Sequence, residues 1–407
     1  MMQLDGQHFD IIIVGGGLAG NCLGLALANS GLQIAIVESS ARSEQLHSAI
    51  GDRALALAAG TVRTLESLGI WQGIREKATA ITDIHVSDRG HFGKARLSAR
   101  KENVDALGYV IIARDIESHV AQLVDNTEIT QLCQTRLVGL ASDTLAVNVS
   151  LKHRDESLCL SAKLLVGADG GNSSVRNLLD IPQEITEYGQ TALVTTVKTA
   201  LPNKNVAYER FTESGPLALL PVGKNQCAVV WTRNDEDAAS LIAGNEQDFI
   251  DQLQDCFGYR LGKLTLTAPR RAFPVSLIRA GQMHAGRAVI IGNAVHQLHP
   301  VAGQGFNLGL RDVVQLADMI LKQHAQGNDI GAAQFLDRYV EARRQDHGRT
   351  IGFTDTLVRL FSNNNLALAA GRNIGLAVLD HIPAAKGILS RYAMGLAQHL
   401  PQVDNRQ

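Results

Sequence analysis

The stretch from Asp10 to Glu38, DIIIVGGGLAGNCLGLALANSGLQIAIVE, constrains the fold more than any other part of the chain. It opens with the apolar run Ile11 to Val14, as in a parallel strand that is buried on both faces. Gly15, Gly17 and Gly20 then follow in the spacing GxGxxG. In this spacing the first glycine permits a tight turn, the second lets a pyrophosphate approach the backbone, and the third lets a helix pack closely on the strand. The stretch therefore predicts a dinucleotide-binding βαβ unit.

The rest of the stretch completes this unit. Leu18 to Ser30 is expected to form the helix, with its N-terminal amides facing a diphosphate, and Ile34 to Val37 the second strand. Glu38 ends that strand about twenty residues after the glycines, where an acid binds a ribose diol and repels a 2′-phosphate. FAD or NAD is thus favoured over NADP. The alternative is a chance match in a chain with 38 glycines, but strand, helix and acid all occur in the required order.

Composition limits the classes of function. With 407 residues, 45% of them hydrophobic, the chain can bury a sizeable core, and its net charge of −2 gives no basic excess for binding nucleic acid. The N-terminus lacks a signal-peptide pattern, and no apolar run approaches the roughly 20 residues of a membrane span. We expect a cytoplasmic protein with at most peripheral contact with the inner membrane. The widely spaced cysteines fit a reducing compartment: Cys22, Cys133, Cys159, Cys227 and Cys256.

The segment after Glu38 is polar and leads to Arg53, after which ALALAAGTVRTLESLGIW has helical spacing. We therefore expect Arg53 at the start of a helix. Two interpretations fit this residue: a cation that meets the diphosphate or the flavin edge, and a solvated surface arginine.

Further elements follow from local patterns. Short apolar runs predict strands at Ile84 to Ser87, Leu107 to Ile112, Lys163 to Ala168 and Arg287 to Ile291, and helices are expected at Asp115 to Val124, Gln304 to Gln323 and Ala332 to Phe361. The region from Thr191 to Ala272 carries several short β-like runs separated by turns, as in an antiparallel sheet. We interpret this region as the main part of a substrate domain.

Three cofactor segments separated by long insertions resemble the FAD-dependent aromatic hydroxylase superfamily, which includes para-hydroxybenzoate hydroxylase. The first is GGGLAG with Glu38. The second is GADGGNSSVR, in which Asp169, Gly170, Ser173 and Arg176 match the motif DGxxSxVR, associated with both FAD and NADPH. The third is GNAVHQLHPVAGQGFNLGLRD at 292–312, similar to the flavin-ribityl motif followed by PxxGQGxNxGxxD.

The third segment also has a physical interpretation. Gly303, Gln304 and Gly305 precede a helix, so a flavin ring can lie against bare backbone while the helix N-terminus faces its N1 and C2 carbonyl. Pro300 rigidifies the approach. Many superfamily members have Asp where this chain has Asn293. The expected cofactor-binding residues are Gly15, Gly17, Gly20, Glu38, Arg53, Asp169, Gly170, Arg176, Gly292, Asn293, Pro300, Gly303, Gly305 and Asn307, with Gln304 beside the ring.

Plainer roles compete for some of these residues. Asp169 can be a turn-former with Arg176 as its salt-bridge partner, and Asp312 can cap its helix or pair with Arg311 on a solvated face. These alternatives stay open at the level of the sequence.

Histidines and aromatic residues raise two further questions. His296 and His299 suggest acid-base or metal chemistry, but no carboxylate cluster accompanies them in the sequence, so we expect packed histidines and no metal site. Trp231 and Phe211 either face an aromatic substrate or belong to the core of a sheet, and the core is the commoner place for them.

Within the superfamily, the stretches GDRALALAAG, ITDIHVSDRGHFG and YERFTESGPLALLP are similar to the ubiquinone-biosynthesis hydroxylases. This resemblance implies a monooxygenase in which NAD(P)H reduces FAD, O2 forms a flavin C4a-hydroperoxide, and a polyprenylated methoxyphenol is hydroxylated para to its hydroxyl. No catalytic side chain is required, because the chemistry belongs to the flavin. NAD(P)H would bind transiently, and other ubiquinone-biosynthesis proteins are candidate partners. The alternatives are an FAD dehydrogenase or oxidase of the same fold and a non-catalytic prenyl-binding protein.

The resemblance also implies an α/β fold: a Rossmann-like FAD-binding domain with an inserted antiparallel substrate domain and a helical C-terminus. The expected boundaries are 1–75, 105–185 and 280–350 for the FAD-binding domain, 76–104 and 186–279 for the substrate domain, and 351–407 for the C-terminal segment. The stretch from Ile351 to Leu400 is apolar with few charges, so it either packs on the core or meets a membrane or a prenyl-carrying partner.

Overall fold

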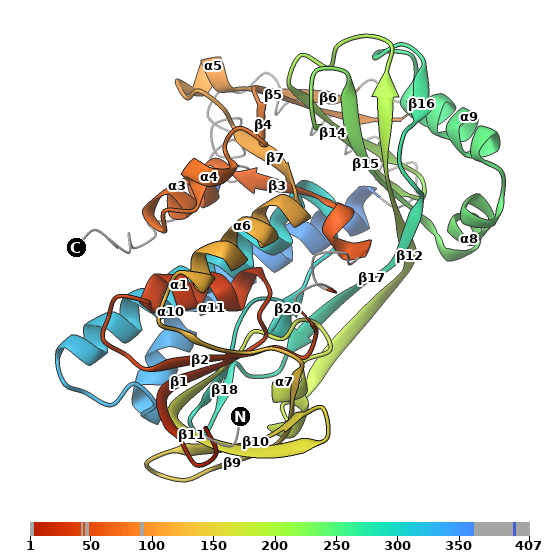
Figure 1. Ribbon diagram of the computed structural model, residues 1–407. Helices are drawn as coiled ribbons and strands as arrows, with labels where there is room; N and C mark the ends of the chain where they lie inside the picture. The colour runs from red at the N-terminus through yellow and green to blue at the C-terminus, as the bar shows by residue number, and fades with distance from the viewer. Residues whose placement is uncertain (1–3, 42–43, 45–48, 90–92, 362–393, 396–407) are drawn as a thin grey trace.

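A computed structural model describes residues 4–41, 44, 49–89, 93–361 and 394–395. Within them the chain forms two large sheets, one small sheet, and helices that pack on them. Figure 1 places the first sheet in the lower half of the molecule and the second at the upper right. This mixed α/β architecture confirms the expected fold class.

The first sheet is built around β1 (His8–Val14), whose Ile11, Ile12 and Ile13 have no exposed surface. Both faces of such a strand are covered, which explains its continuous apolar run. Parallel neighbours of β1 give the order β19 (Ala288–Ile290), β11 (Glu156–Gly167), β1, β2 (Ile34–Val37) and β8 (Thr130–Leu132). Antiparallel strands extend it: β18 (His284–Ala285), β10 (Val147–His153) and β9 (Thr135–Ser142).

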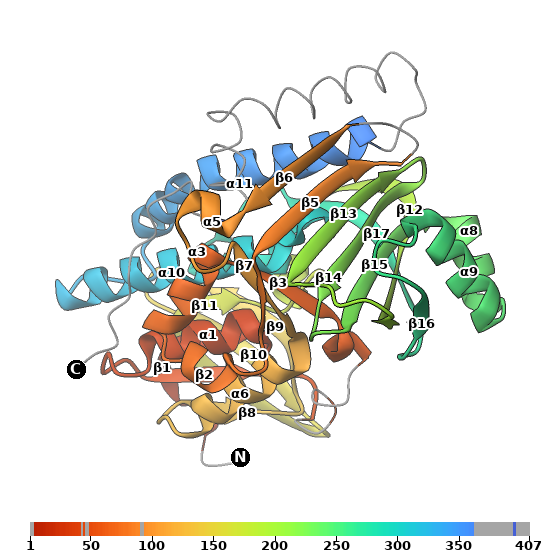
Figure 2. The same cartoon turned by 90° about the horizontal axis from the view of Figure 1, so that it is seen from above.

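The second sheet has nine strands and is antiparallel except for one pair, since β13 runs parallel to β5. Its order is β20 (His296–Gln297), β17 (Arg271–Ala280), β12 (Gln183–Thr199), β15 (Gln226–Asn234), β14 (Gly215–Pro221), β13 (Val206–Thr212), β5 (Asp83–Asp88) and β6 (Lys94–Ser98), with β16 (Leu264–Leu266) on β12. One face packs against α8 (Asp235–Ala243) and α9 (Glu246–Phe257), which Figure 2 shows at the far right. The other face is left for the cavity described below.

The small sheet corrects one prediction. Residues Ala54–Ala58 form strand β3, which pairs with β7 (Gly108–Ile112), and β7 pairs in turn with β4 (Thr79–Ile81). Helix α3 (Ala59–Ser67) begins only after this strand. Arg53 therefore precedes a strand and not a helix. Burial alternates from Ala54 to Leu57, with Leu55 and Leu57 buried, and the apolar composition of ALALAA obscures this period of two in the sequence.

The main helices agree with their predicted positions. These are α1 (Leu18–Leu27), α6 (Ala113–Asp125), α10 (Gln304–Ala325) and α11 (Ala333–Phe361). Helix α1 packs on α10 and α6, so the helix after the glycine turn and the helix after the third motif lie side by side. The short helical elements are η1 (Ala49–Asp52), α4 (Trp71–Ile74), α5 (Ala99–Glu102), α7 (Ser174–Leu178), η2 (Gly292–Ala294) and η3 (Val301–Gly303).

The expected C-terminal segment is described only in part. Residues 351–361 are the last turns of α11, and Val358 packs with Phe211 and Val301. The remainder of the Ile351 to Leu400 prediction falls outside the described residues except at 394–395. Among the helices of the described residues, none combines the length and apolarity that crossing a membrane requires.

Candidate functional site

The site lies where neighbouring parallel strands end. Strands β1, β2, β11 and β19 stop at Val14, Val37, Gly167 and Ile290, and a ligand in an open α/β sheet binds outside such carboxyl ends. A cavity of about 1540 Å³ opens there and continues to the second sheet. This volume exceeds the range of roughly 300 to 1,000 Å³ of common ligand pockets, so it has room for a dinucleotide and a second molecule. Of the expected residues, it is lined by Gly15, Gly17, Glu38, Arg53, Asp169, Gly170, Gly292, Asn293, Pro300, Gly303, Gln304, Gly305 and Asn307.

The glycine turn assigns a different role to each glycine. Gly15 has a φ of +108°, and a Cβ there would lie 2.5 Å from the carbonyl oxygen of Ala168. A Cβ on Gly20 would lie 1.9 Å from the carbonyl oxygen of Gly15, so this glycine sets the close packing of α1 on the turn and does not line the cavity. A Cβ on Gly17 would meet nothing within 4 Å, because this position faces the open cavity. Gly15 and Gly20 shape the turn, and Gly17 leaves space for a ligand.

Glu38 holds the turn from the end of β2. Its Oε2 accepts a hydrogen bond from the amide of Gly16 at 2.8 Å, and its Oε1 accepts one from the amide of Ser40 at 2.8 Å. Oε1 also accepts a hydrogen bond from the hydroxyl of Ser39 at 3.3 Å. The carboxylate lines the cavity in this fixed orientation, and its Oε2 has a further lone pair for a ribose hydroxyl.

In the second motif, Asp169 orients the N-terminus of α7. Its Oδ2 accepts hydrogen bonds from the amides of Ser174 at 2.7 Å and Val175 at 3.1 Å, and its Oδ1 accepts one from the hydroxyl of Ser173. Arg176 is buried and does not line the cavity. Its guanidinium donates to the carbonyl oxygens of Ala294 at 3.0 Å and Gly171 at 2.7 Å, so it joins the second and third motifs behind the cavity wall.

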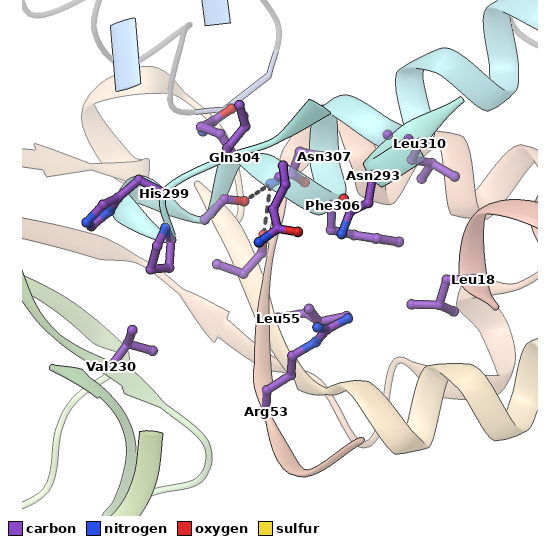
Figure 3. A pocket seen from close by; sticks show the side chains of 18 of the residues that line it. Leu18, Arg53, Leu55, Val230, Asn293, His299, Gln304, Phe306, Asn307 and Leu310 are labelled. Carbon is purple, nitrogen blue, oxygen red and sulfur yellow. Dashed lines mark hydrogen bonds between the residues drawn. The ribbon is translucent and has the colours of Figure 1, made fainter. Parts of the chain in front are cut away.

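Asn293 and Arg53 present polar groups to the cavity from different elements, η2 and the start of β3 (Figure 3). The guanidinium of Arg53 points into the cavity, and its buried Nε has no hydrogen-bond partner among the described residues. Burial lowers the pKa of Arg53, while the neighbouring Glu117 opposes this effect. An orphaned donor in such a position is a natural contact for an anionic or carbonyl-bearing ligand.

The third motif supplies a bare backbone wall. Gly303 has a φ of +59° and packs against Ala56, while a Cβ on Gly305 would meet nothing within 4 Å. The amide of Asn307 ties this wall together: it donates to the carbonyl oxygens of Ala56 at 2.9 Å and Gly303 at 2.7 Å, and accepts from the Ala58 amide at 3.0 Å and the Thr61 hydroxyl. Both donors and both lone pairs of this amide are thereby used within the chain.

Asp312 differs from the expected solvated residue. It is completely buried and accepts four hydrogen bonds, from the Gly292 amide (3.1 Å), His296 (3.1 Å), Arg343 (2.7 Å) and His347 (2.6 Å). Burial raises the pKa of Asp312, but His347 and Arg343 outweigh burial and hold it well below its ordinary value. The interpretation of a pair with Arg311 on a solvated face is therefore wrong. The missed partners lie on α11, where polar residues recur three and four apart within a buried face.

Arg311 has its own buried partner. It donates to the carboxylate of Asp346 at 2.8 Å, and Asp346 also accepts from Arg343 at 2.6 Å. Asp312 and Asp346 thus fasten α10, which begins at the bare backbone wall, to α11.

The two histidines of the third motif separate in space. His296 does have a carboxylate neighbour, so the premise that none accompanies it is wrong: ligand atoms of His296, Asp312 and His347 all lie within 4.8 Å of one another. The Arg343 guanidinium already neutralises this carboxylate, which leaves an unfavourable place for a cation. His299 instead lines the cavity, and burial lowers its pKa to about 4, so the ring is neutral at physiological pH.

The aromatic residues of the second sheet also separate. Trp231 has no exposed surface and packs edge-to-face on Phe249, so its core interpretation is correct. Phe211 lines the cavity. Among residues that the sequence did not nominate, Glu117, Arg136, Asn172 and Glu209 line the cavity as well. Asn172 lies within the second motif and Glu209 within the stretch YERFTESGPLALLP. Glu117 and Arg136 belong to no quoted stretch, and helix packing and strand register bring them to the cavity.

The lining fits FAD on three independent observations: the space that a Cβ on Gly17 or Gly305 would fill, the orphaned Nε of Arg53, and the carboxylate of Glu38 held beside the glycine turn. The first accommodates a pyrophosphate and a flat ring against backbone, and the second and third match an anion and a ribose.

Comparisons with known proteins agree with this fit. The FAD binding domain family matches residues 8–354. The ubiquinone hydroxylase UbiL of Rhodospirillum rubrum is 33% identical, over 97% of this chain and 91% of its own, and the 3-demethoxyubiquinol 3-hydroxylase of Escherichia coli is 29% identical, over 96% and 99%. The crystal structure of p-nitrophenol 4-monooxygenase PnpA from Pseudomonas putida shares the fold with a TM-score of 0.78 at 17% identity, over 98% of this chain and 100% of its own. The chain therefore belongs to the FAD-dependent hydroxylase family that includes the ubiquinone-biosynthesis hydroxylases.

Proposed function

We propose that this protein is the monooxygenase that hydroxylates a polyprenylated methoxyphenol in ubiquinone biosynthesis, with NAD(P)H as electron donor. The observation that carries the proposal is the shape of the cavity, which joins the strand ends of the first sheet to an apolar face of the second. In Figure 3, Leu18 lies at one end of the view and Val230 at the other, with Arg53 and Gln304 between them. A dinucleotide and an apolar aromatic molecule would occupy the two ends.

The chain's own residues would hold the cofactor in stages. The turn at Gly17 receives the pyrophosphate, Glu38 the adenosine ribose, and Asn293 the ribityl hydroxyls, while the ring lies against Gly303 and Gly305. Bound FAD supplies the redox chemistry, passing electrons from NAD(P)H to O2 and one oxygen atom to the ring.

Other residues act by position. Arg176 joins two cofactor segments and Asn307 fixes the backbone of the wall, so we assign both to positioning the flavin. The neutral His299 and the mostly apolar lining of the second sheet exclude water from the reacting ring.

The apolar end supports a prenylated substrate. Its lining residues from the second sheet are mostly apolar, and many are small or aliphatic, including Ala192, Ala207, Leu220 and Val230. Such a surface gains about 25 cal/mol for each Å² of apolar area that it buries, so it favours an isoprenoid over a polar chain. Contact with the inner membrane, a groove for NAD(P)H, protein partners and the domain boundaries at 76, 105, 186, 280 and 351 stay predictions.

The test combines a defined reaction with a cellular one. The purified flavoprotein, given a short-chain prenyl methoxyphenol, should consume NADH or NADPH and O2 in proportion to a hydroquinone product. A dehydrogenase or oxidase would consume its donor without hydroxylated product, and a prenyl-binding protein would bind the phenol without turnover. Mass spectrometry of cells that lack the protein should show accumulation of the unhydroxylated methoxyphenol, and accumulation of a different intermediate would contradict the assigned substrate.

A further inference from the structure

One row of residues crosses the cavity-facing side of the second sheet. Strand register places its members directly opposite one another, and every one of them lines the cavity: Val194, Val230, Ala218, Glu209, Val86 and Ala95, on β12, β15, β14, β13, β5 and β6. Five of the six are apolar. Glu209 is the one charged residue that the described part of this sheet contributes to the cavity.

The alternation of side chains along β13 determines to which face of the sheet Glu209 points. Its neighbour Tyr208 belongs to the core under α9, where it packs edge-to-face on Phe257. Its other neighbour, Arg210, donates to the carbonyl oxygen of Phe257 at 2.8 Å. Since successive side chains of a strand point to opposite faces, Glu209 faces the cavity.

The next row along the same face is entirely apolar where it lines the cavity, with Leu220, Ala207, Ile84 and Leu97. The carboxylate of Glu209 therefore interrupts an otherwise apolar wall. Other acids at the cavity occupy different places, with Glu38 and Asp169 at the strand ends of the first sheet and Glu117 beside Arg53. Glu209 is therefore the acid of the substrate end.

We propose that Glu209 accepts the phenol proton of the substrate during hydroxylation, an inference that rests on the proposed function. The carboxylate takes the proton of the hydroxyl as the ring, now more electron-rich, attacks the electrophilic oxygen that derives from O2 and the two electrons of NAD(P)H. The attacked carbon forms a C–O bond as the O–O bond breaks, and the former phenol oxygen becomes a ketone. Loss of the ring proton from that carbon to water restores aromaticity, and Glu209 returns its proton to the ketone oxygen. The second oxygen atom of O2 leaves as water.

The test uses Glu209→Gln, which keeps the size of the side chain and removes the base. This variant should bind stoichiometric flavin and accept electrons from NADH at the parent rate. Its rate of hydroquinone formation from a short-chain prenyl methoxyphenol should fall on the order of 10²- to 10⁴-fold, the usual contribution of a general base. With a ring-fluorinated analogue, whose hydroxyl is more acidic, the ratio of parent rate to variant rate should shrink.

Glu213→Gln is the matched control, because Glu213 is an exposed acid between β13 and β14. It should hydroxylate both phenols at the parent rate. Parent-like hydroxylation by Glu209→Gln, or an equal loss on both phenols, would overturn the inference. If Glu209→Gln does not bind flavin, Glu209→Asp tests the inference in its place. This variant keeps a carboxylate base on a shorter side chain, so it should bind flavin and show a smaller loss of hydroxylation rate on the same phenol. No hydroquinone from the parent enzyme with any phenol would instead refute the proposed function.

Discussion

Replacing Asp312 by Asn tests the buried connection between α10 and α11. Asp312 accepts hydrogen bonds from Gly292, His296, Arg343 and His347, whereas Asn offers one acceptor oxygen and places an NH2 group where two donors point. At least two of the four hydrogen bonds are lost. A buried guanidinium also loses one of its two anionic neighbours.

The magnitude follows from this environment. Removing one partner of a buried ion pair costs about 3 to 5 kcal/mol of folding free energy. Arg343 keeps Asp346 at 2.6 Å, which places the expected loss near the lower end of that range. The control is Asp318→Asn on the same helix, where Asp318 pairs with the 69% exposed Lys322 and the expected loss is below about 0.5 kcal/mol.

Urea unfolding of the flavin-loaded proteins measures both losses from the shift in midpoint. The pH dependence gives an independent check. Because the pKa of Asp312 lies well below 3.8 in the folded protein, its stabilisation is complete above the unfolded-state pKa and is lost as the pH falls through the folded-state pKa. The difference between parent and Asp312→Asn should therefore be constant above about pH 5 and shrink in stronger acid. Equal small losses in Asp312→Asn and Asp318→Asn would refute the reasoning.

Four further outcomes are expected. Gly17→Val should fold, because a Cβ there meets nothing within 4 Å, but its flavin absorbance should show that FAD is no longer bound. The control Gly348→Val, on an open face of α11, should keep its FAD, and a full complement of FAD in Gly17→Val would disprove the assignment of the turn. Asn293→Leu should weaken the affinity for FAD roughly five- to 150-fold in a flavin titration, because it loses a contact of about 1 to 3 kcal/mol, whereas Asn293→Asp should keep the flavin. An unchanged FAD affinity in Asn293→Leu would show that Asn293 does not contact the cofactor. Arg53→Met should weaken the affinity for FAD roughly 10- to 150-fold, as expected for the loss of a charged hydrogen bond of about 1.5 to 3 kcal/mol. An FAD affinity equal to that of the parent would exclude a contact between Arg53 and the cofactor. Truncation after Phe361 should reduce hydroxylation of long-tailed but not short-tailed phenols, and equal loss on both would indicate a structural role.

The sequence by itself determined the elements whose causes are local. The run Ile11 to Val14, the glycines at 15, 17 and 20, and Glu38 lie within one βαβ unit, so their spacing along the chain already specifies strand, turn and helix. The motif at 292–312 was equally visible, because the glycines that mark the start of its helix are adjacent to its first residue in the sequence. The boundary between β3 and α3 was not visible in the sequence, because ALALAA is compatible with both a strand and a helix. Pairing with β7 makes it a strand.

Only the tertiary structure decided which groups share a site. Asp312 is buried because α11 brings Arg343 and His347 to it from 31 and 35 residues away, and no local pattern encodes that contact. Glu209 reaches the cavity through the register of six strands, four of them from 183–234 and two from 83–98. Side-chain periodicity says that a residue faces one side of its own strand, but pairing across the sheet determines what that side faces.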